Sequence, residues 1–288
     1  MATEGAAART SWRALRLVAA AMSLGRVLSS LLIFSIVFLP STRFLNAMDA
    51  LLLASPFFFL SAAGFAVNDV LDYRIDALNK PYRAIARGAI SRQGAAVVVV
   101  VASCAGLVLA GLAWSLSSFS WLYLVYFVLA MVYNVAVRRS AILKTTIASA
   151  ICASPVLFVE LVLDKPPTLV GVTVGAAVVY IMGREIRMDV LDLEGDRAGG
   201  NRTVALSRGP RAADQLSRLL LYVALAVLLA VVLSTQSPAV ALPICLLIVS
   251  LQGACEYLWG SLDRRRRRRS ILLQWAVMLM GVGAAVLG

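Results

Sequence analysis

Long apolar segments alternate with short polar ones along nearly the whole chain. A membrane-spanning helix needs about 20 consecutive apolar residues, and the segments come close to that length. The breaks between them are polar or contain proline, as at Pro40-Ser41-Thr42 and Asp164-Lys165-Pro166-Pro167. The pattern predicts an all-α, polytopic membrane protein with about nine transmembrane helices. They are expected at residues 18–39, 48–67, 93–115, 119–137, 143–163, 167–187, 213–234, 237–259 and 271–287.

The composition agrees with a membrane protein. Of the 288 residues, 61% are hydrophobic and the mean hydropathy is +0.86, whereas a soluble domain is about half apolar. Residues 1–11 are small and polar and are expected to form a flexible N-terminus. No secretory cleavage pattern follows them, so the first apolar segment is expected to remain as a helix. The cysteines stand singly in apolar segments, as small core residues do; they are Cys104, Cys152, Cys245 and Cys255.

The net charge of +12 would suggest a nucleic-acid partner in a soluble chain, but its distribution explains it here. With nine helices, every Lys and Arg except Arg43 and Lys165 falls on the N-terminal side of the membrane. The positive-inside rule makes that side cytoplasmic. The charge therefore indicates topology and contact with anionic lipid, and no nucleic acid is expected. We interpret the run 264–269, six arginines, as a topology and lipid-headgroup determinant rather than a site.

An acidic motif, DVLDxxxD, occurs twice, each time after an apolar segment. Read as a continuous helix, each copy places three aspartates on one helical face. Both copies would lie at the cytoplasmic ends of even-numbered helices, so they can face each other across one central cavity. The first copy contributes Asp69, Asp72 and Asp76, and the second contributes Asp189, Asp192 and Asp196.

Carboxylates this close together repel one another, so the motifs favour a site for a cation. Hard oxygen ligands suit Mg²⁺, which usually binds one or two carboxylates together with substrate phosphates. The chain contains no histidine, which excludes histidine-based acid–base catalysis and histidine metal ligands. The six aspartates are therefore the candidate metal-binding and catalytic residues.

Basic residues interleave with the two motifs. Lys80 and Arg83 follow the first, Arg184 and Arg202 lie on either side of the second, and Lys144 lies in the loop between the fourth and fifth expected helices. Carboxylates and guanidinium groups facing one space suit a complex of metal and polyphosphate. No Walker sequence is present, which argues against an NTPase. A diphosphate bound at the membrane face over an apolar cavity suggests an amphiphilic substrate, and an isoprenyl diphosphate fits.

The motifs themselves resemble a known family. Asn68-Asp69-x-x-Asp72-x-x-x-Asp76 is similar to the first signature of the UbiA-type intramembrane prenyltransferases, and Arg184-Glu185 through Asp196 resembles the second. The segment 79–91 resembles the branch that includes geranylgeranylglyceryl phosphate geranylgeranyltransferases. That branch commonly has Arg-Pro-x-Arg-Pro, where this chain has Lys80 for the first Arg and Ala84 for the last Pro. The resemblance covers nearly the whole chain, residues 1–288, as a single domain.

The resemblance implies a mechanism. Two Mg²⁺ ions, held by the two motifs, bind the diphosphate of an isoprenyl donor, whose ionisation gives an allylic cation. A small-molecule or lipid acceptor then attacks the cation inside the bilayer. The implied metal ligands are Asn68 and the six aspartates. The implied substrate-binding residues are Asn68, Lys80, Arg83, Tyr133, Lys144, Arg184 and Arg202.

Other interpretations stay open at this point. A terpene cyclase on the same scaffold would ionise the diphosphate and close the cation on itself. An ion-coupled transporter is less favoured, because its charged residues would lie near mid-membrane rather than at helix ends. Aromatic rings could stabilise the cation, and Phe65, Tyr133 and Tyr180 are candidates. Glu160 and Glu256, in apolar segments, are candidates for an acceptor site.

Overall fold

The computed structural model describes residues 20, 23, 26–136 and 140–287. The predicted flexible terminus, 1–11, lies outside the described residues, as do Arg138 and Arg139 of the basic loop near Lys144. No strand occurs in the described ranges. The helices are α2 (Val27–Ser41), α3 (Ala47–Leu71), α4 (Tyr73–Asn79), α5 (Arg92–Leu112), the 3₁₀ turn η1 (Ala113–Leu116), α6 (Leu122–Ala136), α7 (Ala141–Val162), α8 (Pro167–Leu191), α9 (Leu193–Ala198), α10 (Val204–Arg208), α11 (Pro210–Thr235), α12 (Pro238–Trp259) and α13 (Arg264–Leu287).

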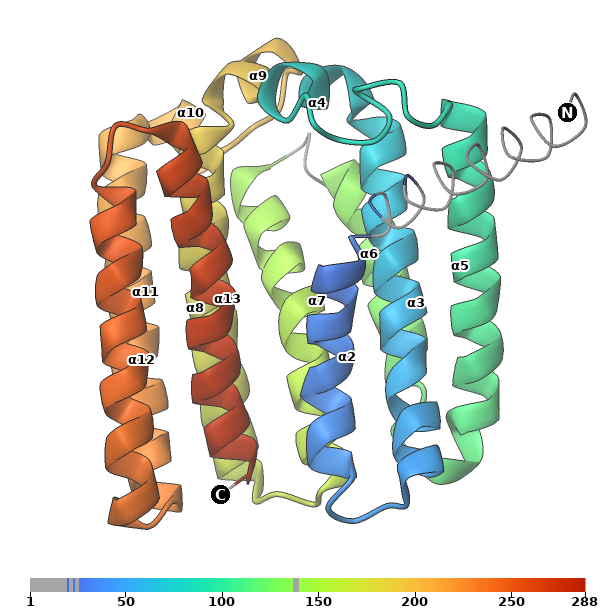
Figure 1. Cartoon of the computed structure of the whole chain (residues 1–288), viewed down its shortest axis with the longest axis vertical. Helices are drawn as coiled ribbons and strands as arrows, with labels where there is room; N and C mark the ends of the chain where they lie inside the picture. The colour runs from blue at the N-terminus through green and yellow to red at the C-terminus, as the bar shows by residue number, and fades with distance from the viewer. Residues whose placement is uncertain (1–19, 21–22, 24–25, 137–139, 288) are drawn as a thin grey trace, which may run out of the picture.

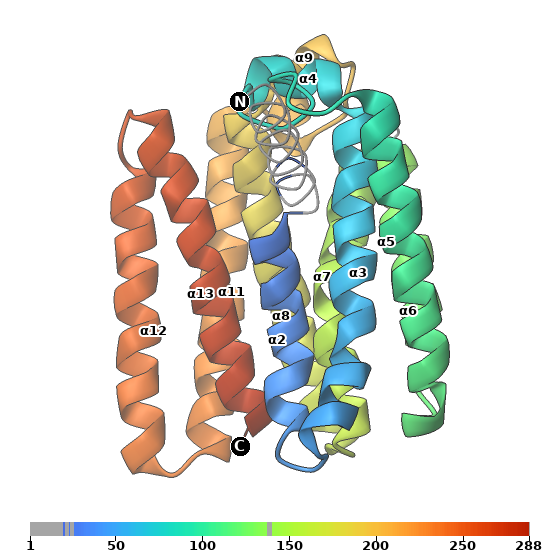
Figure 2. The same ribbon diagram turned by 45° about the vertical axis from the view of Figure 1, so that its right-hand side comes forward.

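The long helices run side by side, and the short helices α4 and α9 lie across one end of them (Figure 1). A turned view shows the same arrangement (Figure 2). Helix α10 lies at the same end (Figure 1). In the described part of the chain, seven helices are long and apolar enough to cross a membrane. Two shorter apolar helices, α2 and α6, run alongside them. The prediction of an all-α membrane fold is confirmed, and the count of nine spans stays a prediction because α2 and α6 are short.

Local sequence signals set where these helices begin. Asn46, Ser91 and Ser140 each precede a helix, and each side-chain oxygen accepts a hydrogen bond from a backbone N–H of the first turn. This bond satisfies one of the donors that a helix start leaves without an intrahelical partner. Pro167 and Pro238 occupy the first helical position, where their missing N–H has no cost.

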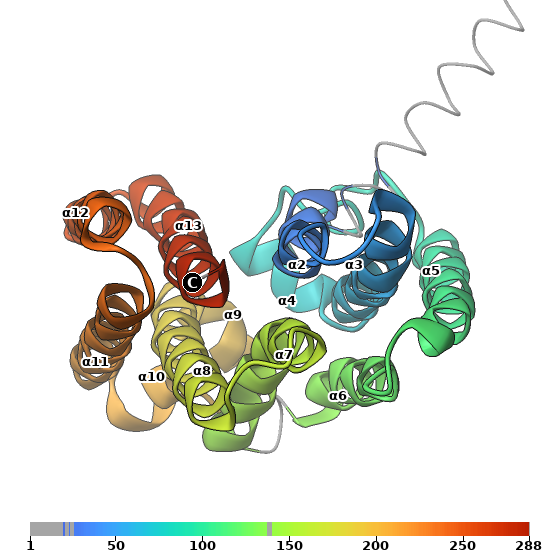
Figure 3. The same cartoon turned by 90° about the horizontal axis from the view of Figure 1, so that it is seen from below.

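Viewed along the helices, two groups are visible, with α7 between them (Figure 3). The group of α2, α3 and α6 packs around Phe57 and Tyr123, and Phe158 of α7 joins this cluster. The group of α8, α11, α12 and α13 packs around Tyr180, and Val156 of α7 belongs to this second cluster. Helix α7 therefore joins the two cores and fixes how the two groups face each other.

Close packing of α8 against α11 depends on Gly183. A Cβ at this position would lie 2.9 Å from the carbonyl oxygen of Ser217, closer than carbon and oxygen approach without strain. The Ser217 hydroxyl donates a 2.8 Å hydrogen bond to the Gly183 carbonyl oxygen. This contact holds α8 in place, and the second acidic motif lies at its end.

The polar ends of the molecule differ in charge. The links α2–α3 and α7–α8 lie at the end opposite α4 and α9 (Figure 1), and they carry Arg43 and Lys165. Arg43 donates a 2.7 Å hydrogen bond to the Leu287 carbonyl oxygen at that same end. Both acidic motifs and the arginine run at the start of α13 lie at the other end. The described basic residues are therefore distributed as the sequence predicts.

Candidate active site

Each acidic motif spans a break between two helices. Helix α3 ends at Leu71 and α4 begins at Tyr73; Asp72, between them, has φ −96° and ψ 11°. Helix α8 ends at Leu191, and Asp192 has almost the same angles, φ −97° and ψ 13°. The prediction that each motif is one continuous helix with three aspartates on one face is wrong. The break turns α4 and α9 across the end of the bundle, where they pack against each other.

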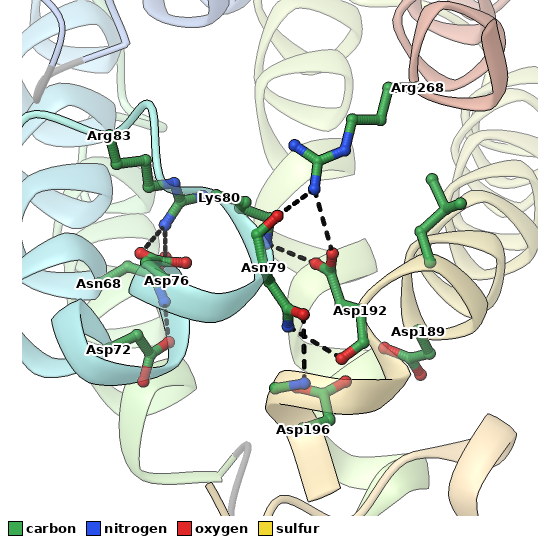
Figure 4. Close-up of polar contacts among 12 residues, drawn as sticks. Asn68, Asp72, Asp76, Asn79, Lys80, Arg83, Asp189, Asp192, Asp196 and Arg268 are labelled. Carbon is green, nitrogen blue, oxygen red and sulfur yellow. Dashed lines mark hydrogen bonds and ion pairs between the residues drawn. The ribbon is translucent and has the colours of Figure 1, made fainter. Parts of the chain in front are cut away.

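Asn79, at the end of α4, joins the two short helices. Its side-chain NH₂ donates to the Asp192 carbonyl oxygen (2.8 Å), and its side-chain oxygen accepts from the Gly195 N–H (3.1 Å). A Cβ at Gly195 would lie 2.3 Å from the Asn79 Nδ2 atom, so only glycine allows this approach. Figure 4 shows Asn79 between α4 and α9.

A cavity of about 180 Å³ lies beneath these helices and receives side chains from both motifs. As the sequence predicted, the motifs face each other across one space. Its apolar walls come from α2, α3, α6 and α7, among them Ile33, Phe65, Tyr126 and Ile151. Aspartates that line it are Asp72, Asp76, Asp189, Asp192 and Asp196.

Asp69 occupies a different position. It is buried, and it lines a neighbouring pocket rather than this cavity. Its Oδ1 atom accepts hydrogen bonds from Arg26 (2.9 Å) and Arg83 (2.7 Å). The Arg83 Nη1 atom also donates to Asp76 Oδ2 at 2.5 Å. Asp69 therefore fixes two guanidinium groups at the edge of the site, while Asp72 and Asp76 of the same motif reach the cavity.

Charges in this corner are closely coupled. Burial raises the pKa of Asp76 above its ordinary value, although Arg83 and Lys80 oppose the rise. Burial works against the charge on Arg83, but Asp69 and Asp76 together raise the pKa of its guanidinium. The ionised form of Asp76 is thus disfavoured by desolvation. A cation at this carboxylate would offset that cost.

The second motif is paired with lysines. Lys144 of α7 forms an ion pair with Asp189, and Lys80 forms one of 2.5 Å with Asp192. Asp196 accepts a 3.0 Å hydrogen bond from the side chain of Asn201. One oxygen of Asp189 and one of Asp196 are buried and have no hydrogen-bond partner among the described residues. Unpaired buried carboxylate oxygens are costly, and both side chains line the cavity.

The carboxylates fit a magnesium site that the substrate completes. Among the described residues, no three Asp, Glu or Cys side chains are grouped closely enough to hold a metal unaided. Mg²⁺ needs only one or two carboxylates when phosphate oxygens supply the other ligands. The unpaired oxygens of Asp189 and Asp196 are suitable ligands on one side, and Asp72 and Asp76 on the other.

Most of the remaining predicted residues lie in the cavity. Asn68, Lys80, Arg83, Tyr133, Lys144 and Arg184 line it. The Asn68 amide donates to Asp72 Oδ2 (2.8 Å), which orients that carboxylate. Arg184 donates to Glu185 (2.8 Å), and its guanidinium carbon lies 4.6 Å from the centre of the Trp275 ring. Arg202 is exposed and is not among the described residues that line the cavity.

Several other candidates lie elsewhere. Tyr180 is buried and donates to Gln252 (2.9 Å), away from the cavity. Glu256 accepts two hydrogen bonds from Arg187, at 2.7 and 2.8 Å, in the core between α8 and α12. Glu160 is buried in the last turn of α7, at the opposite end of the bundle. Of the proposed aromatic residues, Phe65 and Tyr133 do line the cavity.

Sequence reasoning missed Arg26, Asn79 and Arg268 as site residues. Arg26 and Arg268 were assigned to membrane topology, because the positive-inside bias accounts for basic residues in general. The arginine run does not lie wholly away from the site as predicted: Arg268 donates to Asn79 and Tyr82 and lies 3.9 Å from Asp192. For Arg268, the sequence signal that could have been used is helical spacing, which separates the arginines of the run into two helix faces.

Comparison with known proteins agrees with this geometry. The sequence profile described as "UbiA prenyltransferase family" matches residues 27–280. A digeranylgeranylglyceryl phosphate synthase from Thermococcus kodakarensis is 28% identical over 55% of this chain and 56% of its own length. One from Natronomonas pharaonis is 32% identical over 62% of this chain and 61% of its own length. The chain thus aligns with somewhat more than half of these relatives.

Solved structures share the fold. A UbiA homologue from Aeropyrum pernix superposes with a TM-score of 0.69 at 22% identity, covering 91% of this chain and 98% of that one. A UbiA homologue from Archaeoglobus fulgidus, bound to GPP and Mg²⁺, superposes with a TM-score of 0.67 at 14% identity, covering 92% and 99%. At these identities the likeness shows the arrangement of helices.

Proposed function

The chain belongs to the UbiA prenyltransferase family, and we propose that it ionises an isoprenyl diphosphate in the cavity beneath α4 and α9 and transfers the prenyl group to an acceptor. One observation carries the proposal. Five of the six aspartates of the two DVLDxxxD motifs line a single cavity together with Lys80, Arg83, Lys144 and Arg184. Carboxylates for a cation and basic groups for an anion are thus present in the same space.

Basic side chains would bind the donor's diphosphate. Lys80 and Lys144 are paired with Asp192 and Asp189, and Arg83 bridges Asp69 and Asp76. Each ammonium or guanidinium group is therefore held in place before substrate arrives. We propose that the two motifs hold two Mg²⁺ ions. Bound Mg²⁺ would neutralise the negative charge that the diphosphate gains as a leaving group. The Archaeoglobus fulgidus homologue, solved with GPP and Mg²⁺, supports this choice of ligands.

Apolar and aromatic side chains would surround the prenyl chain. Ile33, Ile151 and Phe65 form walls of the cavity on the membrane side of the charged groups. They exclude water, which would otherwise capture an allylic cation. The rings of Tyr126 and Tyr133 also line the cavity, and an aromatic face stabilises a nearby cation.

For the acceptor, we propose a lipid that carries a glyceryl phosphate group. The support is that the relatives in Thermococcus kodakarensis and Natronomonas pharaonis are named digeranylgeranylglyceryl phosphate synthases. The acceptor's hydroxyl oxygen would form the new bond to the prenyl carbon as the carbon–oxygen bond to diphosphate breaks. Its proton would pass to the departing diphosphate, to a cavity aspartate or to water, since the chain has no histidine.

Product analysis tests this proposal. Purified protein is supplied with geranyl, farnesyl or geranylgeranyl diphosphate and Mg²⁺, with and without a prenylglyceryl phosphate acceptor, and extracts are analysed by mass spectrometry. We expect an acceptor that has gained one prenyl group, with inorganic diphosphate released in equal amount. A cyclic hydrocarbon formed without acceptor, at a rate that depends on Asp192, would instead identify a terpene cyclase.

We further propose that the end bearing α4 and α9 faces the cytoplasm, because the described basic residues concentrate there. Thr42, in the link α2–α3, and Ser207, in α10, are both exposed and lie at opposite ends. In a cysteine-free background, Thr42→Cys should react with a membrane-impermeant maleimide added outside intact cells, and Ser207→Cys should react only after lysis. The reverse pattern would show the opposite orientation.

A further inference from the structure

The arginine run at the start of α13 has two faces. Arg264, Arg267 and Arg268 are half-buried, whereas the other three arginines are exposed. Positions three and four apart share one face of a helix, so this division follows from helical geometry. Arg264 donates to the Leu191 carbonyl oxygen (2.7 Å), and Arg267 donates to the Ser261 carbonyl oxygen (2.7 Å). These two arginines stabilise the chain near the site, whereas Arg268 contacts residues of the site itself.

Arg268 contacts both halves of the site. Its Nη1 atom donates to the Tyr82 hydroxyl (2.7 Å), and its Nη2 atom donates to the Asn79 carbonyl oxygen and lies 3.9 Å from Asp192 Oδ1. Figure 4 shows this guanidinium pointing from α13 toward Asn79 and Asp192. Its plane is therefore fixed by uncharged oxygens, while its charge is only loosely paired with a carboxylate.

The guanidinium also lines a second pocket, of about 250 Å³, that adjoins the cavity. Lys80, Arg83 and Asp192 lie in the wall common to both spaces. Five cationic side chains line this pocket against two carboxylates, Asp69 and Asp192. The cationic residues are Arg26, Lys80, Arg83, Arg184 and Arg268.

This excess of positive charge indicates an anionic ligand. Four of these cations already have a close carboxylate partner: Asp69 is shared by Arg26 and Arg83, Lys80 pairs with Asp192, and Arg184 pairs with Glu185. Arg268 is the least closely paired of the five, at 3.9 Å from Asp192, so its charge is the one most available to an anion. The wall continues onto apolar residues of α13, Ile271 and Trp275. A fixed fork of guanidinium donors beside an apolar wall suits a phosphate group attached to a hydrocarbon body.

We propose that this second pocket binds the phosphate group of a lipid acceptor, and that Arg268 is a specificity-determining residue that contacts it. The proposal rests on the proposed function, since it assigns the acceptor's anionic group to a place beside the donor's diphosphate. Lys80 and Arg83, in the common wall, would then lie between two anions. Arg268 contacts only the acceptor in this arrangement.

Steady-state kinetics of Arg268→Gln test the assignment. The substitution keeps hydrogen-bond donors but removes the charge, and we expect the KM for a prenylglyceryl phosphate acceptor to rise about 10-fold or more. The kcat and the KM for the prenyl diphosphate should stay within about 2-fold of the unmodified enzyme. Arg265→Gln, on the exposed face of the same run, is the matched control and should change none of the three.

Two kinetic results would overturn the assignment. A higher KM for the donor with an unchanged KM for the acceptor would place Arg268 at the diphosphate. Equal effects of Arg268→Gln and Arg265→Gln would show a general surface charge effect. If Arg268→Gln does not fold, Arg268→Lys keeps the charge without the fork; the acceptor KM should still rise, and an unchanged value would contradict the proposal.

A binding measurement separates this inference from the proposed function. Without donor, the protein in detergent is titrated with a prenylglyceryl phosphate and with the matching prenylglycerol, and its melting temperature is recorded. The phosphate lipid should stabilise the unmodified protein and Arg265→Gln, but not Arg268→Gln, and prenylglycerol should do little in any of them. If the phosphate lipid stabilises the protein in this way but no prenyl transfer is detected, the proposed function is rejected and the second pocket is retained. Transfer with no preference for the phosphate lipid would reject the second pocket alone.

Discussion

At the scale of single residues, the site consists of carboxylates whose oxygens are unequally satisfied. Asp69 shares one oxygen between Arg26 and Arg83, whereas Asp189 keeps one buried oxygen that has no hydrogen-bond partner among the described residues. The first arrangement is that of an anchor for neighbouring side chains. The second leaves a strong acceptor unpaired in a side chain that lines the cavity, and such an oxygen is available to a metal ion. Substitution of an anchoring aspartate such as Asp69 should therefore have a different effect from substitution of a metal-binding one such as Asp189.

Asp72→Asn and Asp192→Asn should each lower kcat by about 100-fold or more, because each removes a negative charge at the point where the diphosphate and its cation are expected. The asparagine keeps the size of the side chain, so folding should be retained. Turnover and melting temperature in detergent are measured for both. Asp164→Asn, at the opposite end of the bundle and at positive φ (51°), which asparagine tolerates, is the control. A variant of either motif residue with nearly full turnover would show that its carboxylate has only a structural role.

Glu256→Ala should destabilise the protein by about 3–5 kcal/mol, because it removes the partner of a buried charge. The Arg187 side chain is 0% exposed, and two of its nitrogens already have no hydrogen-bond partner among the described residues. Thermal melting in detergent measures the effect. Arg218→Ala breaks an exposed ion pair with Asp214 and should change stability by about 1 kcal/mol or less. Loss of turnover in a stably folded Glu256 variant would instead support an acceptor role for this residue.

At the scale of secondary-structure elements, the decisive feature is that α3 and α8 both end one residue before an aspartate. After each of these two helices the chain changes direction and forms a short helix that lies across the end of the bundle (Figure 1). Neither short helix is long enough to be stable alone. They are stabilised by each other through Asn79 and Gly195, and by Arg264, which contacts the Leu191 carbonyl oxygen. The position of Asp76 and Asp196 depends on this contact.

Gly195→Ala should lower turnover by about 10-fold or more and reduce stability by about 1–3 kcal/mol, the usual range for added volume in a close-packed contact. The new Cβ would meet the end of the Asn79 side chain at 2.3 Å, so this side chain must leave its hydrogen bonds to α9 or the two helices must move apart. Activity and melting temperature are recorded together. Gly253→Ala in α12, where a Cβ meets nothing within 4 Å, should leave both unchanged. An active, stable Gly195→Ala protein would show that the contact can open without consequence.

At the scale of the whole molecule, the site exists only because two groups of helices are brought together. Asp72 and Asp76 come from the group that includes α3, and Asp189, Asp192 and Asp196 come from the group that includes α8. Helix α7 packs in both apolar cores and also supplies Lys144, which pairs with Asp189. Carboxylates gathered in this way repel one another, so a cation that binds between the groups should stabilise the whole fold.

Chelation of divalent ions should abolish transfer, and added Mg²⁺ should restore it. With a prenyl diphosphate present, Mg²⁺ should also raise the melting temperature of the unmodified protein, because ligand that binds only the folded state stabilises it. The double variant Asp72→Asn, Asp192→Asn should show little of this rise, whereas Asp164→Asn should show all of it. Full turnover in excess chelator would contradict a metal-dependent mechanism.

The membrane fold and the acidic character of the candidate site follow from local sequence. Apolar segments of spanning length can bury their backbone polar groups only as helices, so the all-α architecture follows from local composition. The repeated DVLDxxxD motif, placed at the ends of two such segments, likewise indicates paired acidic sites without any tertiary knowledge. Lys80, Arg83 and Arg184 are predicted from their nearness to these motifs, and Lys144 from its loop at the same end of the expected helices; all four line the cavity.

Which of these residues share one cavity depends on packing between distant segments. The breaks at Asp72 and Asp192 arise because α4 and α9 pack on each other, a contact between segments more than a hundred residues apart in the sequence. Asp69 belongs to the first motif and Arg202 follows the second, yet neither is among the residues that line the cavity. Arg268 lies in a run of six identical residues. The rotation of α13 about its axis decides which of the six face the site. Local sequence encodes helices and charge, and the side-chain neighbours across helices are fixed by packing.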